Sequence, residues 1–534
     1  MPKNLFFDKH QNFFALFFLL IGTFLYSYHL NFFAKFPGDN LDGRFNQFTL
    51  EYFYSVLIGK NESFIHGNFF YALPNTMNLS DNHWLLAPIY SLLRILGLNE
   101  ISSYQIWVYL GFMANYLACL YVFKKFKFNP FSCAIGAYLF SFNQIHFEKI
   151  THIQLNLKIF IILGIWYFKR YIDTQNFKYA SYIFLCFTLQ LICNAYTGNF
   201  FMILMLALIL IFFSNYKIHE YKKFIPQKLD FKITIPIFIL SALILGIWAY
   251  PYYQTMQIYN LNKPIIITNL EFKFFDLLTS NSNIILAYLV NFFELNSLKN
   301  YGENLFFIGF IPWFVLIYFF LNKKLLKSLN QFEKILLKST IFLLIFFYLE
   351  KYFGLFNLIQ IYIKSFTNLR AYSRFFYVIF FSFIYFCTFV FNRFKFQNNW
   401  KYLQILTLIL ATLEPFFLKN NNYSVNKIQE EYQEVKYKFI DKNIQPDSII
   451  YLVPKISSDI EQFVKNQILM MHLANELGVK TINGYSSFFP LSLIKPANCG
   501  RLFRIYDENE KIISNITNKE FKYNQSNLIV HCEL

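Results

Sequence analysis

Apolar runs long enough to cross a membrane recur through most of the first 417 residues. A transmembrane helix needs about 20 mainly apolar residues, and 56% of this chain is apolar, with 72 Phe and 39 Tyr. That composition is too hydrophobic for a soluble protein of 534 residues. The sequence therefore predicts a polytopic α-helical membrane protein of about eleven spans, a few of them short. The predicted spans lie near Phe13–Phe33, Tyr104–Phe123, Pro130–Phe147, Leu157–Phe168, Tyr179–Cys193, Phe200–Phe213, Ile233–Tyr250, Leu305–Leu321, Ile335–Leu349, Phe375–Phe391 and Tyr402–Phe417.

The distribution of Lys and Arg predicts the orientation. Cytoplasmic loops of membrane proteins are enriched in these residues, and alternate loops here carry Lys clusters if Lys3 and Lys9 are cytoplasmic. The first apolar segment lacks a small-residue cleavage site and is expected to stay as an anchor. Three long stretches then lie outside: residues 34–103, residues 251–304 and everything after Leu418.

The formal net charge of +17 lies almost entirely on the membrane half, because the tail from residue 418 onward has nearly balanced charges. An excess in cytoplasmic loops is a property of topology. It does not indicate nucleic-acid binding, and no nucleic-acid partner is expected.

The tail differs in pattern from the rest of the chain. Short apolar runs at Ser448–Val453, Val479–Ile482 and Asn527–His531 predict strands, and Ile460–Leu477 predicts an amphipathic helix. We expect two domains: a membrane domain, 1–417, and a small extracytoplasmic α/β domain, 418–534. Cys499 and Cys532 lie in that domain, where an oxidising compartment permits a disulfide; the other five cysteines lie in apolar runs.

The first outer stretch begins with two carboxylates, Asp39 and Asp42, next to Arg44. Carboxylates at the outer mouth of a helical bundle suit a general base, and a pair suits a divalent metal ion, which is the one cofactor the sequence suggests. The alternative is an Asx turn in a solvated loop shaped by Pro37 and the adjacent glycines.

Other polar residues fall on the same side of the membrane. Ser80 and Asp81 form a second group in the first outer stretch, where capping of the next helix is the alternative role. An arginine fork matches the oxygens of a lipid-linked phosphate, whereas each polar residue alone also suits an interfacial anchor or cap. The remaining candidates are His152, Gln154, Glu303, Arg370 and Arg374, with Asn143, Gln144, His146, Asn194, Tyr196 and Asn199 nearby.

These features resemble the C-type (GT-C) membrane glycosyltransferases, and most closely their uncharacterised bacterial members. The resemblance covers most of the chain, although its motifs are short. It is carried by Gly38-Asp39, Asp42-Gly43-Arg44-Phe45-Asn46, Ser80-Asp81, Ala87-Pro88-Ile89-Tyr90, Thr151-His152-Ile153-Gln154-Leu155, Glu303 with Leu305 and Gly309, Arg370-Ala371 with Arg374-Phe375, and Asn483-Gly484-Tyr485-Ser486.

The resemblance implies a GT-C-like fold in the bacterial cytoplasmic membrane and transfer of a sugar from a polyprenyl-phosphate-linked donor to a glycan, lipid or protein acceptor. Asp39 or Asp42 is then the general base. The donor phosphate is bound by Arg370, Arg374 and Arg44, while Asp81, His152, Gln154 and Glu303 position the substrates. The carboxylates stand three residues apart, unlike the Asp-Glu or Asp-x-Asp pairs of better-known members, so both the base and any metal ion stay open.

Two other functions fit the same sequence. A transporter or flippase of lipid-linked glycans predicts charged or helix-breaking residues near mid-membrane, whereas the spans here are mostly Phe, Leu and Ile. A non-catalytic envelope assembly protein would act through its outer tail. Membrane lipids are partners under every one of these hypotheses.

Overall fold

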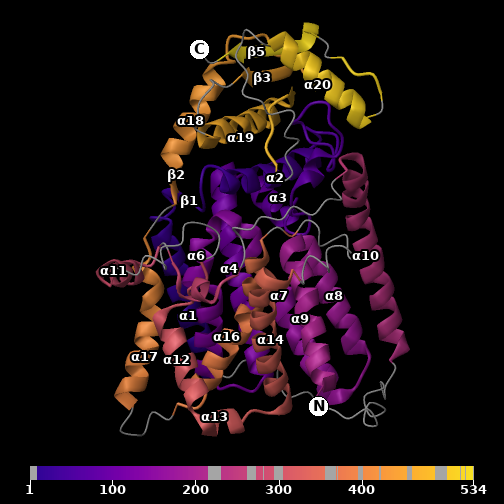
Figure 1. Ribbon diagram of the computed structural model, residues 1–534. Helices are drawn as coiled ribbons and strands as arrows, with labels where there is room; N and C mark the ends of the chain where they lie inside the picture. The colour runs from indigo at the N-terminus through magenta and orange to yellow at the C-terminus, as the bar shows by residue number, and fades with distance from the viewer. Residues whose placement is uncertain are drawn as a thin grey trace.

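The computed structural model is mainly helical, and an α/β tail lies across one end of the helical bundle (Figure 1). The structure describes residues 9–214, 230–260, 272–280, 282–293, 305–354, 369, 371–394, 401–419, 422–453, 460–486, 502–517, 519–522 and 525–532. The bundle helices are α1 (Lys9–His29), α4 (Glu100–Lys125), α5 (Pro130–Ser141), α6 (Gln144–Glu148), α7 (Ile159–Thr174), α8 (Lys178–Cys193), α9 (Ala195–Ser214), α10 (Phe231–Ile258), α11 (Ile284–Phe292), α12 (Phe310–Leu321), α13 (Lys323–Lys327), α14 (Gln331–Phe353), α16 (Phe376–Phe391) and α17 (Lys401–Leu413).

Six helical segments within the described residues are long and apolar enough to cross a membrane, and α8 and α12 are shorter apolar helices. A helical membrane protein is therefore confirmed as the fold class, whereas the count of about eleven spans stays a prediction.

Two predicted runs are interrupted. The run 130–147 breaks at Asn143, whose side chain accepts from the Ile145 N–H at 3.1 Å and begins α6. The run 402–417 ends in a 3-10 turn at Glu414–Phe417.

Asparagine side chains begin several of these helices. Asn99 accepts from the Ser102 N–H at 2.8 Å at the start of α4, and Asn129 accepts from the Ser132 N–H at 2.8 Å at the start of α5. At α14, Asn330 and Glu333 each accept from the other's backbone N–H. These caps satisfy N–H groups that a helix leaves free at its first turn, so loop residues fix where each apolar helix begins.

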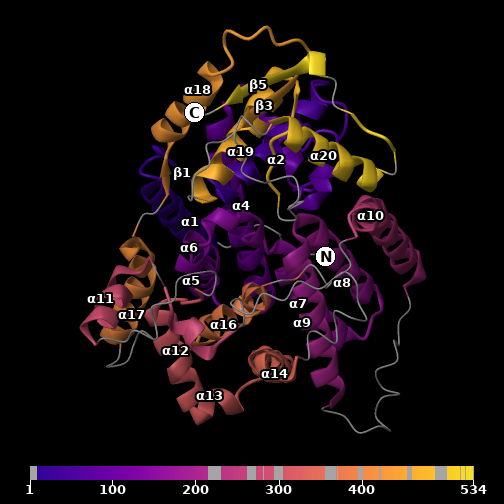
Figure 2. The ribbon, with the colours of Figure 1, turned by 45° about the horizontal axis from the view of Figure 1, so that its top comes forward.

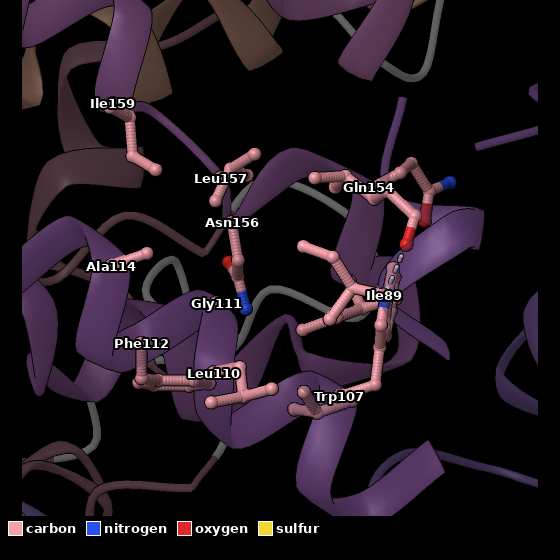
Figure 3. Close-up of a pocket in the computed structure, with 13 residues that line it drawn as sticks. Ile89, Trp107, Leu110, Gly111, Phe112, Ala114, Gln154, Asn156, Leu157 and Ile159 are labelled. Carbon is pink, nitrogen blue, oxygen red and sulfur yellow. Dashed lines mark hydrogen bonds between the residues drawn. The ribbon is translucent and has the colours of Figure 1, made fainter. Parts of the chain in front are cut away.

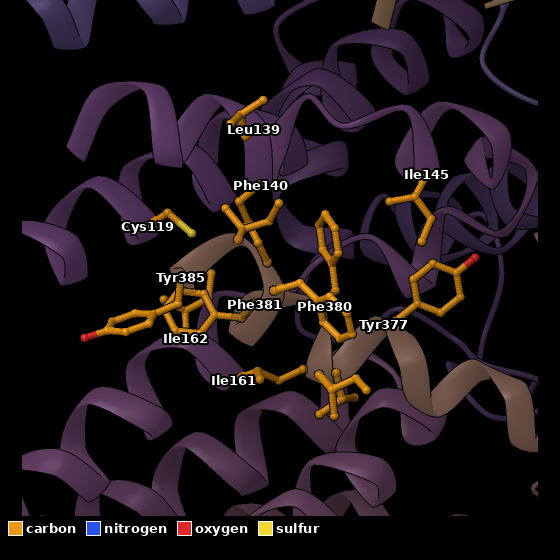
Figure 4. Packing of buried hydrophobic residues seen from close by; sticks show 14 of the residues in the cluster. Cys119, Leu139, Phe140, Ile145, Ile161, Ile162, Tyr377, Phe380, Phe381 and Tyr385 are labelled. Atoms are coloured by element: carbon orange, nitrogen blue, oxygen red, sulfur yellow. The ribbon is translucent and has the colours of Figure 1, made fainter. Parts of the chain in front are cut away.

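Helix α16 forms the centre of the bundle. All of its residues are buried, and Phe380 stacks on Phe140 of α5 with ring centroids 5.3 Å apart (Figure 4). Helix α10 lies at the edge against α8 and exposes most of its apolar side chains, including Leu243 at 59%. An apolar helix exposed in this way is suited to contact with lipid.

A glycine and a carboxylate fix the start of α12. Gly309 has φ +110° and ψ 152°, a conformation that is essentially reserved for glycine, and the Glu414 carboxylate accepts from the Phe310 and Ile311 N–H groups. A Cβ atom at Gly309 would stand 2.8 Å from Glu414 Oε2.

We therefore predict that Gly309→Ala lowers the free energy of unfolding by about 1–3 kcal/mol. The measurement is the apparent melting temperature in detergent. Gly246→Ala is the matched control, because a Cβ atom there meets nothing within 4 Å. Equal melting temperatures for the two variants would contradict the prediction.

The tail contains a parallel sheet of three strands in the order β4-β3-β5. The central strand β3 (Ile449–Val453) is fully buried, with Ile449 aligned with both Lys480 of β4 (Lys480–Thr481) and Leu528 of β5 (Leu528–Cys532). Helix α19 (Ile460–Leu477) connects β3 to β4, and α18 (Val425–Tyr437) and α20 (Leu502–Thr517) complete the tail. The strands and the helix predicted from sequence are confirmed here.

The first outer stretch packs against the tail. Its helices are α2 (Asp42–Leu57) and α3 (Ala87–Ile95). Helix α2 contacts α19 and lies beneath α19 and β3 in Figure 1, and the turned view of Figure 2 shows α2 and α19 side by side. Phe48, Phe69 and Phe70 share one hydrophobic cluster with Ile449 and Met471 of the tail. The expected boundary at residue 417 assigns this stretch to the membrane domain, whereas the structure gives it a common core with the tail.

The cysteines have two environments. Cys119, Cys133, Cys186, Cys193 and Cys387 are free and buried within apolar segments. Cys532 in β5 is disulfide-bonded. Cys499, its expected partner, lies outside the described residues.

Candidate functional site

The carboxylate of Asp39 shapes the turn before α2. Its Oδ1 accepts from the Leu41 N–H at 3.1 Å and from the Gly43 N–H at 2.9 Å, which is an Asx turn. Gly38 has φ +110°, and a Cβ atom there would stand 3.2 Å from the Thr151 Cα. The alternative interpretation therefore describes the turn correctly, but the turn is packed against residue 151 and is not a solvated loop.

Asp42 lies in the first turn of α2 and has a different environment. Its Oδ1 accepts from the Tyr485 hydroxyl at 2.7 Å, and its Oδ2 lies 3.7 Å from His152 Nδ1. The side chain is still 36% exposed. Three segments far apart in sequence meet here: α2, the 3-10 segment Ile150–Leu155 and the segment after β4. Asp42 is therefore the carboxylate that is both oriented and open to a ligand.

Burial changes the titration of Asp39. The pKa of its carboxyl is raised to about 6, mainly by burial and further by the nearby charge of Asp42, while the bonds from Gly43 and Leu41 oppose the rise. Between pH of about 4 and 6 the folded chain thus holds a proton that an unfolded Asp releases.

We predict from this shift that stability falls as the pH rises. Because the pKa is higher in the folded chain, the free energy of unfolding decreases through this window, and we expect the apparent melting temperature to fall by about 1–3 °C. Asp39→Asn keeps an acceptor for the turn and should flatten the profile. Asp441→Asn, a change at an exposed tail carboxylate, is the control; an unchanged slope in Asp39→Asn would contradict the prediction.

A series of hydrogen bonds connects the Asp42 region with the second acidic group. Asn46 of α2 donates to the Thr151 carbonyl at 3.1 Å, and its Oδ1 lies 3.0 Å from His83 Nε2. Burial lowers the pKa of His83 to about 4, so the ring is neutral at pH 7 and donates through Nε2. Asn46 therefore ties α2 to both the 3-10 segment and the chain around Asp81.

Asp81 belongs to the first outer stretch, and its side chain contacts the start of α9. Its carboxylate accepts from Asn194 Nδ2 at 2.7 Å and from the Ala195 N–H at 3.4 Å. Burial raises the pKa of Asp81 to about 6, and its bonds to α9 and the charge of Arg374 oppose the rise. The Arg374 guanidinium also lies over the Tyr196 ring, 4.8 Å from its centroid. Asp81, Asn194 and Arg374 thus form a group between the first outer stretch and helices α9 and α16.

The remaining predicted residues are placed as follows. Gln154 lines an apolar pocket between α3 and α4. Arg44 is 3% exposed and contacts Gln47 and the Phe36 ring, so its guanidinium is inside the protein and not in the open group around Asp42. Glu303 and Arg370 lie outside the described residues. The structure therefore places Asp39, Asp42, His152 and Gln154 in one region and Asp81 with Arg374 in another, joined through Asn46 and His83.

The described residues offer little for a metal ion. They contain no group of three His, Cys, Asp or Glu side chains that could hold one. Asp39 Oδ1 is already bonded to two backbone N–H groups, so Asp42 is the better single ligand. The described part of the chain does not by itself form a metal centre.

No protein-family model matches the chain, and no curated protein matches it either. Its function must therefore be argued from the site.

Sequence reasoning did not include two side chains that this site uses. Tyr485 lies in the motif Asn483-Gly484-Tyr485-Ser486, which the resemblance marked without a role, and Asn46 lies in Asp42-Gly43-Arg44-Phe45-Asn46. Chemically, an oriented carboxylate beside a phenol and an imidazole can accept a proton from a bound hydroxyl group.

Proposed function

We propose that the protein is an integral membrane glycosyltransferase of GT-C-like fold with about eleven spans. It moves a sugar from a polyprenyl-phosphate-linked donor to an acceptor hydroxyl at the outer face of a bacterial cytoplasmic membrane. The observation that carries this proposal is Asp42, an exposed carboxylate oriented by Tyr485 and His152 where the bundle meets the tail.

In the proposed reaction Asp42 takes the proton of the acceptor hydroxyl. The acceptor oxygen then forms a bond to the anomeric carbon of the sugar, and the bond from that carbon to the phosphate oxygen breaks, with its electrons leaving on the phosphate. Tyr485 donates to Oδ1 of Asp42, which leaves Oδ2, on the His152 side, to receive the proton. Such a base typically contributes about 10²–10⁴-fold to the rate.

Arg374 is proposed to stabilise the charge on the departing phosphate, with Arg370 beside it in sequence. Its guanidinium lies on the Tyr196 ring, and its positive charge interacts electrostatically with the Asp81 carboxylate. Stacking on an aromatic ring holds the planar fork in one orientation, and the Asp81 group anchors the start of α9 next to it. These contacts support a preorganised arginine at the donor end of the site.

The test is the profile of lipid-linked and surface glycans by mass spectrometry. A deletion strain is compared with strains restored by the wild type or by Asp42→Asn. A missing sugar that only the wild type restores would support the transferase and identify the donor. An unchanged profile in the deletion strain would refute it.

One observation favours a transporter as the second candidate. Lys158 and His146 are fully buried in the bundle, with Nζ 2.7 Å from Nε2, and ionisable groups inside a membrane often mark a translocation path. Lys158, however, is the N-cap of α7, so the pair lies at a helix end and not within several spans. Loss of glycan flipping into vesicles in Lys158→Met, with transfer intact, would favour the transporter.

A further inference from the structure

An apolar pocket lies beside the candidate base, between α3, α4 and the start of α7 (Figure 3). Trp107 forms one wall and donates from Nε1 to the Leu86 carbonyl at 3.0 Å. Gly111 of α4 lines another wall, and a Cβ atom there would meet nothing within 4 Å. No charged side chain of the described residues lines it, so the pocket suits an uncharged apolar group.

Two amide side chains, Gln154 and Asn156, give the pocket its polar character. Asn156 Oδ1 and Gln154 Oε1 are both buried without a hydrogen-bond donor from the protein, and Asn156 is only 4% exposed. A buried acceptor that lacks a donor is costly. Both amides therefore favour a ligand that brings hydrogen-bond donors such as hydroxyl groups, and both disfavour an anion.

One wall of the pocket belongs to a helix with an exposed apolar face. Helix α3 exposes a row of apolar side chains. Ile89 lines the pocket and is 42% exposed, and the row continues with Leu92, Ile95 and Leu96. An amphipathic helix with an exposed apolar face is suited to the membrane interface. We therefore expect a lipid chain to enter the pocket beside this row of side chains.

The position of the pocket separates it from the donor end of the site. Gln154 is two residues from His152, which lies 3.7 Å from Asp42, and the Trp107 ring packs on His83 with centroids 5.5 Å apart. Arg374 lies instead with Asp81 near α9. The pocket thus shares the segment of Gln154 with His152 and Asp42, and Arg374 is not among its lining residues.

From these observations we infer that the pocket binds the apolar chain of the acceptor, and that the acceptor is an uncharged lipid bearing a hydroxyl group. This inference rests on the proposed function and narrows its acceptor from a glycan, lipid or protein to a neutral lipid alcohol. On binding, the hydroxyl donates its single proton to an amide oxygen on the Asp42 side of the pocket, and it rotates to donate to Asp42 Oδ2 for the transfer.

The test uses Trp107 as the reporter. The full-length protein is placed in nanodiscs that contain dibromostearoyl diacylglycerol, or phosphatidic acid with the same brominated chains, and the Trp107 signal is the difference between wild type and Trp107→Phe. We expect saturable quenching by the diacylglycerol and at least about tenfold weaker quenching by the anionic lipid. Equal quenching by both lipids, or none by the diacylglycerol, would overturn the inference.

Two variants separate specific binding from general bilayer contact. Gly111→Leu fills the pocket and should abolish the quenching, whereas Gly246→Leu makes the same change on the open surface of α10 and should leave it intact. Gln154→Leu should weaken binding of the diacylglycerol by about tenfold through one lost hydrogen bond. Quenching that persists in Gly111→Leu would overturn the inference.

This binding measurement does not depend on sugar transfer. If the quenching follows the expected pattern while the deletion strain keeps its full glycan profile, the proposed function fails but the pocket still binds a neutral lipid. If the profile changes and the pocket does not discriminate, the transferase stands and the acceptor assignment fails.

Discussion

Asp42→Asn is expected to lower sugar transfer by about 10²–10⁴-fold, the usual contribution of a general base. The asparagine keeps the size of the side chain and can still accept from the Tyr485 hydroxyl, but it cannot take a proton. Expression and melting temperature should therefore stay near those of the wild type. The measurement is transfer from a polyprenyl-phosphate-linked sugar by purified protein, with single-turnover rates compared at one pH.

The neighbouring carboxylate provides the comparison for this variant. Asp39 Oδ1 is bonded to the N–H groups of Leu41 and Gly43, and an asparagine preserves that turn. Asp39→Asn should consequently lose much less activity than Asp42→Asn. A larger loss in Asp39→Asn would assign the proton transfer to Asp39, and normal transfer by both variants would remove this loop from the mechanism.

The second large effect is expected at Gly484, where the tail meets the first outer stretch. A Cβ atom there would stand 2.4 Å from the Phe70 ring, and the Gly484 N–H donates to Gln467 Oε1 at 3.1 Å. Gly484→Leu forces these segments apart, at a cost of about 1–3 kcal/mol for overpacking. Because the next residue is Tyr485, transfer should fall with the stability of the tail.

The readout for this variant is limited proteolysis of the tail together with transfer activity. Gly478→Asn is the matched control, because Gly478 has φ +70° with its nearest neighbour at 3.7 Å, and asparagine tolerates this backbone region. Gly484→Leu with a protease-resistant tail and normal transfer would show that the packing of the tail is irrelevant to the site.

The helices and strands that produce a local apolar pattern were predictable from the sequence. Apolar runs identified helices such as α4 and α9, and short apolar runs in the tail identified β3 and α19. Periodicity fails where a single polar residue starts a new helix inside an apolar run, as Asn143 does at α6. The span count is sensitive to such breaks, because they change the length of a helix without changing its composition.

The candidate residues of the site were predictable from each segment, but the contacts between distant segments were not. Asp42 and His152 were both candidates, and they meet in the structure. The contact between Tyr485 and Asp42 joins residues 443 positions apart, and no local pattern reports such a pairing. Arg44 is the converse case: its charge suggested a phosphate ligand, and the structure places its side chain in the protein interior, which no local pattern indicates.

A short pairing near the start of the chain has a consequence for biosynthesis. Strand β1 (Lys35–Phe36) pairs antiparallel with β2 (Tyr423–Ser424), and the Tyr423 N–H donates to the Gly38 carbonyl at 3.2 Å. The ribosome makes these partners almost 400 residues apart, and contacts of such separation form late. The segment that carries Asp42 therefore stays without its partner strand until β2 has been synthesised. Nascent chains that stall before that point are expected to reach the bilayer without a finished site and with apolar surface open to quality-control proteases.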